Sequence, residues 1–156
     1  ELTRAGWGIV ALSEAGHLQA DLYGHLPGPT QTSGRAELYA LIVALRFWMP
    51  GSIIYTDYEG VVRGYASGRA KCCHSGKADA DLWRLFWDRV ADTGPIALRW
   101  TKAHASTRHV TSGVSTDFQR NGNRLADQAA KDGAALHFDV CDRTHFERRF
   151  FLGEST

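Results

Sequence analysis

The chain has 156 residues, of which 44% are hydrophobic and 22% are charged, and its formal net charge is +1. This length and composition predict one globular domain. The small net charge neither favours nor excludes binding to nucleic acid, so any basic patch must come from local clustering of charge. No apolar run approaches the roughly 18 residues of a membrane-spanning helix. Three cysteines, two of them adjacent (Cys72 and Cys73), do not suggest a disulfide framework and favour an intracellular, reducing compartment.

The first part of the chain predicts a hairpin followed by a helix. Residues 6–12 are apolar and β-prone, and residues 17–23 alternate apolar and polar side chains, so the two segments are expected to pair. From residue 35 to about residue 48, apolar side chains recur at spacings of three and four, which predicts an amphipathic helix. Pro50-Gly51 ends this helix.

Strands and helices alternate through the rest of the pattern. The predicted elements are a buried strand at 53–56, a helix at 59–65, a basic loop at 67–77, a helix at 79–90, a strand at 96–101, a loop at 103–122 and a helix at 123–136. This order predicts an α/β fold with a mixed sheet flanked by helices. We expect residues 1–136 to form the domain and residues 137–156 to form a C-terminal tail.

Three carboxylates occupy positions that favour a cation site. Glu37 lies in the first turn of the first helix, Asp57 follows the buried strand at 53–56, and Asp127 lies inside the last helix. Ligands gather at the carboxyl ends of strands in open α/β sheets, and carboxylate oxygens hold hard cations. Each residue also has a purely structural explanation: a charge at a helix N-terminus, a turn residue and a solvated helix face, respectively.

Four motifs around these residues resemble the ribonuclease H family, in the family's order and on the matching elements. The motifs are Thr32-Ser33-Gly34-Arg35-Ala36-Glu37-Leu38, Tyr55-Thr56-Asp57, Trp100-Thr101-Lys102-Ala103-His104 and Gly122-Asn123-Arg124-Leu125-Ala126-Asp127. The resemblance covers roughly Ala5 to Ala135 and suggests a retroelement-type or eukaryotic relative. It implies a ribonuclease H-like mixed sheet.

The resemblance also implies an activity: metal-dependent endonucleolytic cleavage of the RNA strand in RNA–DNA hybrids. Two Mg²⁺ (or Mn²⁺) ions, about 4 Å apart, would clamp the scissile phosphate. Glu37, Asp57 and Asp127 would be metal ligands and catalytic residues. A histidine on the loop before the last helix would assist, and His109 is the preferred candidate over His104.

Substrate contacts depart further from the family pattern than the metal-ligand positions do. The residues expected to contact nucleic acid are Thr32, Ser33, Arg69, Lys71 and Lys77, although a solvated surface explains the basic residues equally well. Ser33 and Gly34 stand where the family often has Asn, and Tyr58-Glu59 stands where it often has Ser-Gln. Arg124 stands where an acidic residue is common.

The family's fourth carboxylate should come from a first strand ending in Asp-Gly-Ser, upstream of Gly6-Trp7-Gly8, and this strand is apparently missing. An open sheet without its middle strand leaves unpaired backbone groups that are costly to bury. We expect an upstream segment to supply the strand. The alternatives are a partner chain and a permuted strand through residues 138–142, and the tail phenylalanines would dock on this domain or on a partner.

Two functions follow from this gap. The first is a ribonuclease H that is active when the missing strand is supplied. The alternative is a catalytically inactive ribonuclease H-like module, kept as a structural or interaction subunit of a larger protein assembly.

Overall fold

The computed structural model describes residues 5–132 and 149–155. The strands are β1 (Gly6–Leu12), β2 (Leu18–His25), β3 (Ile53–Thr56), β4 (Ala97–Trp100) and β5 (Arg149–Ser155). The helices are α1 (Ser33–Leu45), α2 (Glu59–Ser67), α3 (Arg69–Cys73), α4 (Ala80–Thr93), α5 (Thr107–Thr111) and α6 (Asp117–Asp132). The five strands form one mixed sheet in the order β2-β1-β5-β3-β4, which confirms the predicted α/β class.

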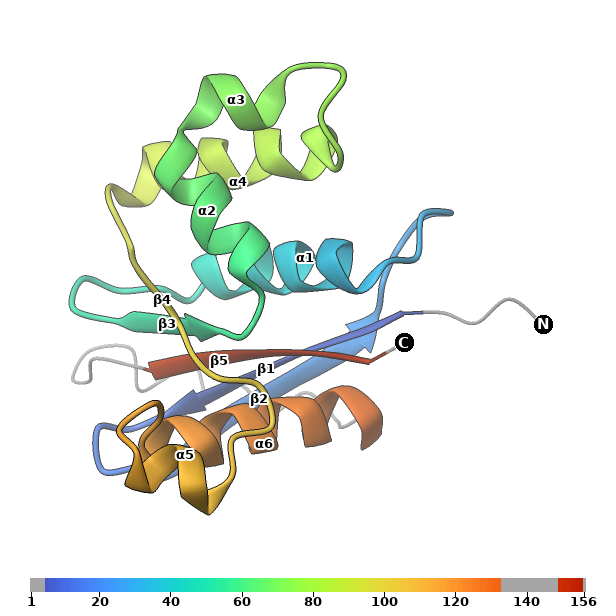
Figure 1. Cartoon of the computed structure of the whole chain (residues 1–156). Coiled ribbons are helices and arrows are strands. Elements are labelled where there is room, and N and C mark those ends of the chain that lie inside the picture. The colour runs from blue at the N-terminus through green and yellow to red at the C-terminus, as the bar shows by residue number, and fades with distance from the viewer. Residues whose placement is uncertain (1–4, 133–148, 156) are drawn as a thin grey trace.

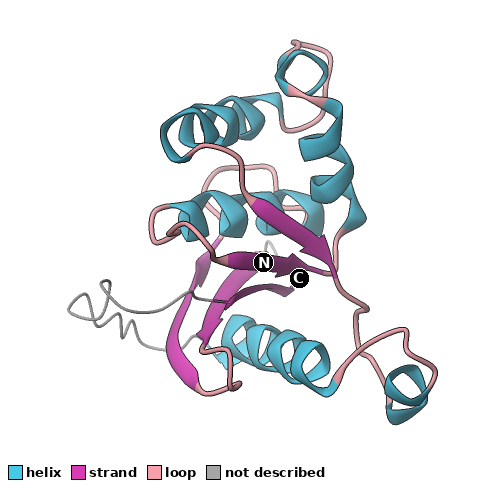
Figure 2. Ribbon diagram, turned by 90° about the vertical axis from the view of Figure 1, so that its left-hand side faces the viewer, coloured by secondary structure: helices cyan, strands magenta, loops and turns pink. Residues whose placement is uncertain are grey.

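Helices cover both faces of the sheet (Figures 1 and 2). Helix α1 lies on one face with α2, α3 and α4 beyond it, and α6 lies on the other face. Because neighbouring strand residues point to opposite faces, Ile54 and Phe150 join the core under α1, while Tyr55 and Phe151 join the core under α6. Burying each such side chain contributes roughly 1.5–3 kcal/mol.

The place expected to be vacant in the middle of the sheet is filled by the chain's own strand β5. It pairs antiparallel with β1, placing Gly8 beside Gly153, and parallel with β3, placing Tyr55 beside Phe151. The expectation of a missing strand therefore gives way to a strand from residues that were assigned to a tail. The reason is packing: Phe150, Phe151 and Leu152 are all at most 1% exposed. Residues 138–142, considered above for a permuted strand, lie outside the described residues.

Three helical segments differ from the sequence prediction. Helix α6 begins at Asp117 rather than at residue 123, and α3 and α5 occupy segments predicted to be loops. The first two turns of α6 are polar, and their Gly122 is a poor helix former in isolation. In the fold, the ring of Phe151 fills the space where a side chain at position 122 would lie, so glycine is needed there. Helices α3 and α5 have five residues each, too few to show a period.

Close backbone approach fixes α6 on the sheet. A Cβ atom added to Gly153 would lie 2.3 Å from the carbonyl oxygen of Ala126, and one added to Gly8 would lie 2.9 Å from the same oxygen. Only glycine at both strand positions allows the helix to pack this closely. The contact places Asp127, next in sequence after Ala126, against the end of β5. Among the described residues, no helix is long and apolar enough to cross a membrane.

Candidate active site at the carboxyl end of the sheet

Four carboxylates from four elements interact electrostatically at one end of the sheet. Glu37 comes from α1, Asp57 directly follows β3, Asp127 comes from α6, and Glu154 comes from β5. Glu154 lies two residues after Leu152, so strand alternation directs it to the face that α1 covers, where Glu37 lies. The three predicted carboxylates are thus brought together, and the structure adds a fourth.

Glu37 is the most buried of the four. It is 1% exposed, and neither side-chain oxygen accepts a hydrogen bond from a nitrogen or hydroxyl group of a described residue. The Asp57 carboxyl lies close enough to share a hydrogen bond with Glu37 when one of the two acids is protonated. Burial, followed by the negative charge of Asp57, raises the pKa of Glu37 well above its usual value. The prediction that Glu37 lies in the first turn is wrong: α1 begins at Ser33, so Glu37 lies in the second turn, away from the free N–H groups of the helix N-terminus. A buried structural carboxylate would normally find a donor. The absence of one among the described residues argues against a purely structural role for Glu37.

Asp57 is held by a buried asparagine. The Nδ2 of Asn123 donates a hydrogen bond to Asp57 Oδ2 at 3.1 Å, and the Oδ1 of Asn123 accepts one from the His104 backbone N–H at 3.3 Å. Asn123 is only 3% exposed, so it connects the end of β3, the loop after β4 and α6 through one rigid side chain. This link fixes the orientation of the Asp57 carboxylate.

Asp127 and Glu154 experience the same negative field. Burial and the charge of Asp57 raise the pKa of Asp127 to about 6, against which the charge of His104 acts in the opposite direction. Burial and Asp57 also raise the pKa of Glu154, whose Oε2 is buried and has no hydrogen-bond partner among the described residues. Several carboxylates held together with buried, unpaired oxygens form a strongly electronegative site.

The donor set fits a hard divalent cation, although no ready coordination shell exists. Within the described residues, no three His, Cys, Asp or Glu side chains are grouped closely enough to hold a metal ion as they stand. The unpaired oxygens of Glu37 and Glu154 are nevertheless the ligand type that Mg²⁺ and Mn²⁺ prefer. A cation would have to draw carboxylates together that now repel one another.

The two candidate histidines have different surroundings. His109, the preferred candidate, lies in α5, where its ring and the Ser106 side chain form a reciprocal N-terminal cap; its Nδ1 accepts a hydrogen bond from the Ser106 backbone N–H at 3.0 Å. His104 lies with its Nδ1 3.9 Å from Asp127 Oδ2, and its side chain is 82% exposed. Of the two histidines, only His104 is in contact with a carboxylate of the site.

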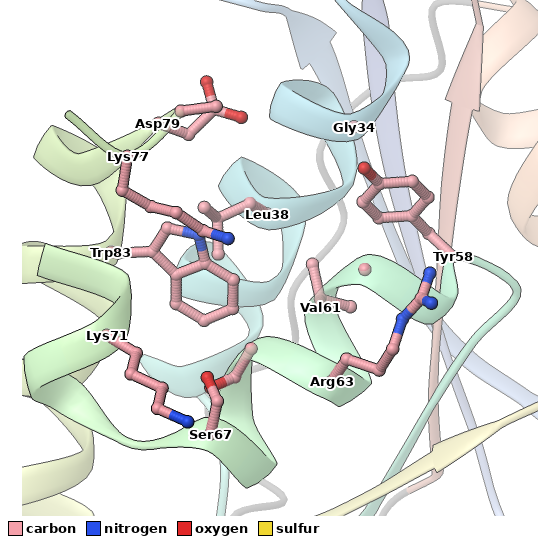
Figure 3. A pocket seen from close by; sticks show the side chains of 13 residues that line it. Gly34, Leu38, Tyr58, Val61, Arg63, Ser67, Lys71, Lys77, Asp79 and Trp83 are labelled. Carbon is pink, nitrogen blue, oxygen red and sulfur yellow. The ribbon is translucent and has the colours of Figure 1, made fainter.

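The predicted nucleic-acid residues divide between a cavity and the helix that borders it. A cavity of about 410 Å³ lies between α1, α2 and α4, and Lys71 and Lys77 line it. Figure 3 shows these lysines on one side, with Trp83, and Arg63 on the other. Arg69 is not among the lining residues; it pairs instead with Asp88 at 2.7 Å.

Thr32 and Ser33 lie at the start of α1, where both are exposed. The Thr32 hydroxyl accepts a hydrogen bond from the Arg35 backbone N–H at 3.2 Å, so it serves as the N-cap of the helix.

The sequence analysis did not identify Glu154, and it included Asn123 in a motif without assigning it a role. A signal for Glu154 exists in the run Phe150-Phe151-Leu152, a short apolar segment followed by glycine and an acidic residue. Strands that are buried on both faces have continuous apolar sequences rather than alternating ones.

The fold and the site define an α/β domain with an acidic centre at the carboxyl end of a mixed sheet. Residues 2–135 match the sequence profile of RNase H, and the chain belongs to this family. Strand β5, with Glu154, lies outside the matched residues. The chain matches no curated protein and no solved structure.

Proposed function

We propose that this domain cleaves the RNA strand of RNA–DNA hybrids in a reaction that depends on Mg²⁺ or Mn²⁺. The observation that carries the proposal is Glu37, which is buried, has no nitrogen or hydroxyl donor among the described residues, and interacts electrostatically with the three other carboxylates. A fold keeps such a buried acid without a donor only where something offsets its cost. Family membership favours a divalent cation at this place over a structural ion pair.

The four carboxylates are the proposed metal ligands. Glu37, Asp57, Asp127 and Glu154 would hold the metal, with Glu154 taking the part that the resemblance assigns to an upstream aspartate. When bound there, the metal supplies a nucleophilic water at neutral pH and charge stabilisation for the leaving oxygen. Asn123 keeps Asp57 oriented through its hydrogen bond.

The remaining residues bind and orient the nucleic acid. Lys71 and Lys77 attract backbone phosphates to the cavity beside α1, and Thr32 and Ser33 face the strand from the exposed start of that helix. His104 is placed to exchange a proton near Asp127 because it is exposed and adjacent to that carboxylate.

The test is a Mg²⁺ titration of the full chain against RNA–DNA hybrids labelled on one strand or the other. We expect Mg²⁺-dependent cutting of the RNA with the DNA spared, and loss of that cutting in Asp57→Asn. The matched control is Asp92→Asn, which removes an exposed carboxylate on α4 and should leave cleavage unchanged. A folded protein that never cuts, or an Asp57→Asn variant that cuts normally, would overturn the proposal and favour the inactive module.

A further inference from the structure

A second cavity lies on the opposite side of the sheet from the one that Lys71 and Lys77 line. It has a volume of about 240 Å³ and lies between α6 and the loop that follows β4. Residues of both signs line it: the ionisable ones are His104, Arg120, Arg124, Asp127 and Lys131. Because Asp127 also belongs to the carboxylate cluster, this cavity adjoins the proposed active site directly.

Spacing along α6 gathers its cations on one face of the helix. Arg120, Arg124, Asp127 and Lys131 follow one another at intervals of four, three and four residues, which places them in one row. Cations at i and i+4, such as Arg120 and Arg124, repel each other along a helix. Helix packing does not explain this row, since Arg120, Arg124 and Lys131 are all exposed.

No salt bridge pairs these three cations with a carboxylate within the described part of the chain, although the charges of Lys131 and Asp127 interact. Arg120 donates to the Thr107 hydroxyl at 3.3 Å, and Arg124 donates to the amide oxygen of Asn121 at 2.9 Å. Both acceptors are neutral. No ion pair to a described residue involves Arg120, Arg124 or Lys131, in contrast to Arg35 on α1, which has two carboxylate partners. The cavity therefore carries an excess of positive charge beside a cluster of negative charge.

We infer that this cavity binds a backbone phosphate of the nucleic-acid strand next to the phosphate at the carboxylates. Guanidinium groups bind phosphate oxygens with paired hydrogen bonds, and a phosphate here would offset the repulsion along α6. The inference rests on the proposed function, because it takes the strand to pass over Asp57 and Asp127. With basic cavities on both sides of the sheet, the strand would run from one to the other across the site.

The first experiment measures binding of a short labelled RNA–DNA hybrid by fluorescence anisotropy between about 50 and 200 mM salt. All proteins carry Asp57→Asn and are used with Mg²⁺, so that the strand stays intact. We expect the added pair Arg124→Gln and Lys131→Gln to weaken binding and to reduce the salt slope by about 1 for each side chain. The matched pair Arg46→Gln and Arg89→Gln removes two exposed cations that line neither cavity and should leave the slope unchanged.

A second experiment locates the phosphate. Single methylphosphonate linkages, which remove one phosphate charge, are placed along each strand in turn. We expect one position whose neutralisation weakens binding to the Asp57→Asn protein but has no further effect in the Arg124→Gln, Lys131→Gln variant, as a double-mutant cycle requires.

The outcomes separate the two proposals. If the hybrid binds and the cavity variant keeps the full salt slope, the phosphate site is wrong while the proposed function stands. If the chain does not bind the hybrid at all, both fail.

Discussion

Arg35 and Glu37 lie two positions apart on α1, but only Arg35 has oppositely charged partners. Arg35 donates from its two terminal nitrogens to Asp81 at 2.7 and 2.9 Å and to Asp79 at 3.2 Å, so two carboxylates at the start of α4 balance its charge. Its Nε is buried and has no hydrogen-bond partner among the described residues. This pairing raises the pKa of Arg35 and lowers the pKa of Asp81 to about 2. Glu37 has no such partner, and burial raises its pKa well above its usual value.

The α1–α4 contact and the carboxylate cluster therefore differ in whether their charged groups are paired. The contact between α1 and α4 uses paired charges, which stabilise the folded state. At the carboxyl end of the sheet, four carboxylates are held together without paired cations, which costs stability in the absence of a ligand. The first region therefore has a structural role, and the second is the region to which the proposed function assigns binding.

The largest expected effect follows Glu37→Gln. This change keeps the shape of the side chain but removes one ligand of the proposed site, so cleavage of the hybrid should fall by more than about 100-fold, beyond the usual cost of losing an outer-shell partner. Thermal unfolding should show an intact fold. Asp92→Asn serves as the control, and normal cleavage by the Glu37→Gln protein would contradict the role given to this residue.

The next effect follows Gly153→Ala, which disturbs the site without altering charge. The added methyl group would collide with the backbone of Ala126, so α6 would have to move away from β5. We expect a loss of about 1–3 kcal/mol in the free energy of unfolding, typical of overpacking. Gly76→Ala is the matched control, since its new methyl group would meet only the side chain of exposed His74. Equal stability of the two variants would contradict the close packing of α6.

At the contact between α1 and α4, Arg35→Met should lower the free energy of unfolding by about 1–2 kcal/mol. Its guanidinium is mostly buried while Asp81 is 60% exposed, so solvent screens part of the interaction. Cleavage per folded molecule should change little, because Arg35 does not belong to the carboxylate cluster. Denaturant unfolding measures the expected loss of stability, and the hybrid assay measures the expected unchanged cleavage. A large loss of cleavage without a loss of stability would contradict the structural role given to Arg35.

The smallest effect is a pH dependence whose sign differs between the two regions. A carboxyl with a raised pKa binds its proton more tightly in the folded state, so stability falls as pH rises; for Asp127 this range runs from 3.8 to about 6. Asp81 has a lowered pKa, so its contribution is present above 3.8 and is lost as pH falls toward about 2. Melting temperatures in metal-free buffer should therefore peak near pH 4. A steady rise from about pH 4 to about pH 6 would contradict the unpaired cluster.

Three of the four carboxylates could be found from the sequence because local patterns place them. Glu37, Asp57 and Asp127 each lie on an element that its own periodicity or apolar run predicts. Glu154 could not be placed in this way. The position of β5 between β1 and β3 depends on pairing across more than ninety residues, since Ile53 aligns with Arg149. Such long-range pairing leaves no local signal beyond a short apolar run.

Local signals also failed where a structure is short or depends on a neighbour. The early start of α6 depends on Phe151 packing over Gly122, which the sequence near Gly122 does not reveal. The role predicted for His109 stays a prediction. The structure shows only that His104 adopts a left-handed backbone with φ of 48° and lies near Asp127, while His109 takes part in a helix cap.

The central claim is that the unpaired carboxylates, including Glu154 from the chain's last described strand, hold a divalent cation. The most direct test is calorimetric titration of Mn²⁺ into the full chain and into Glu154→Gln, with Asp92→Asn as the control. We predict saturable binding by the unaltered chain and by the control, and binding weakened by more than about tenfold in Glu154→Gln. Absence of binding, or equal affinity in all three proteins, would contradict the claim.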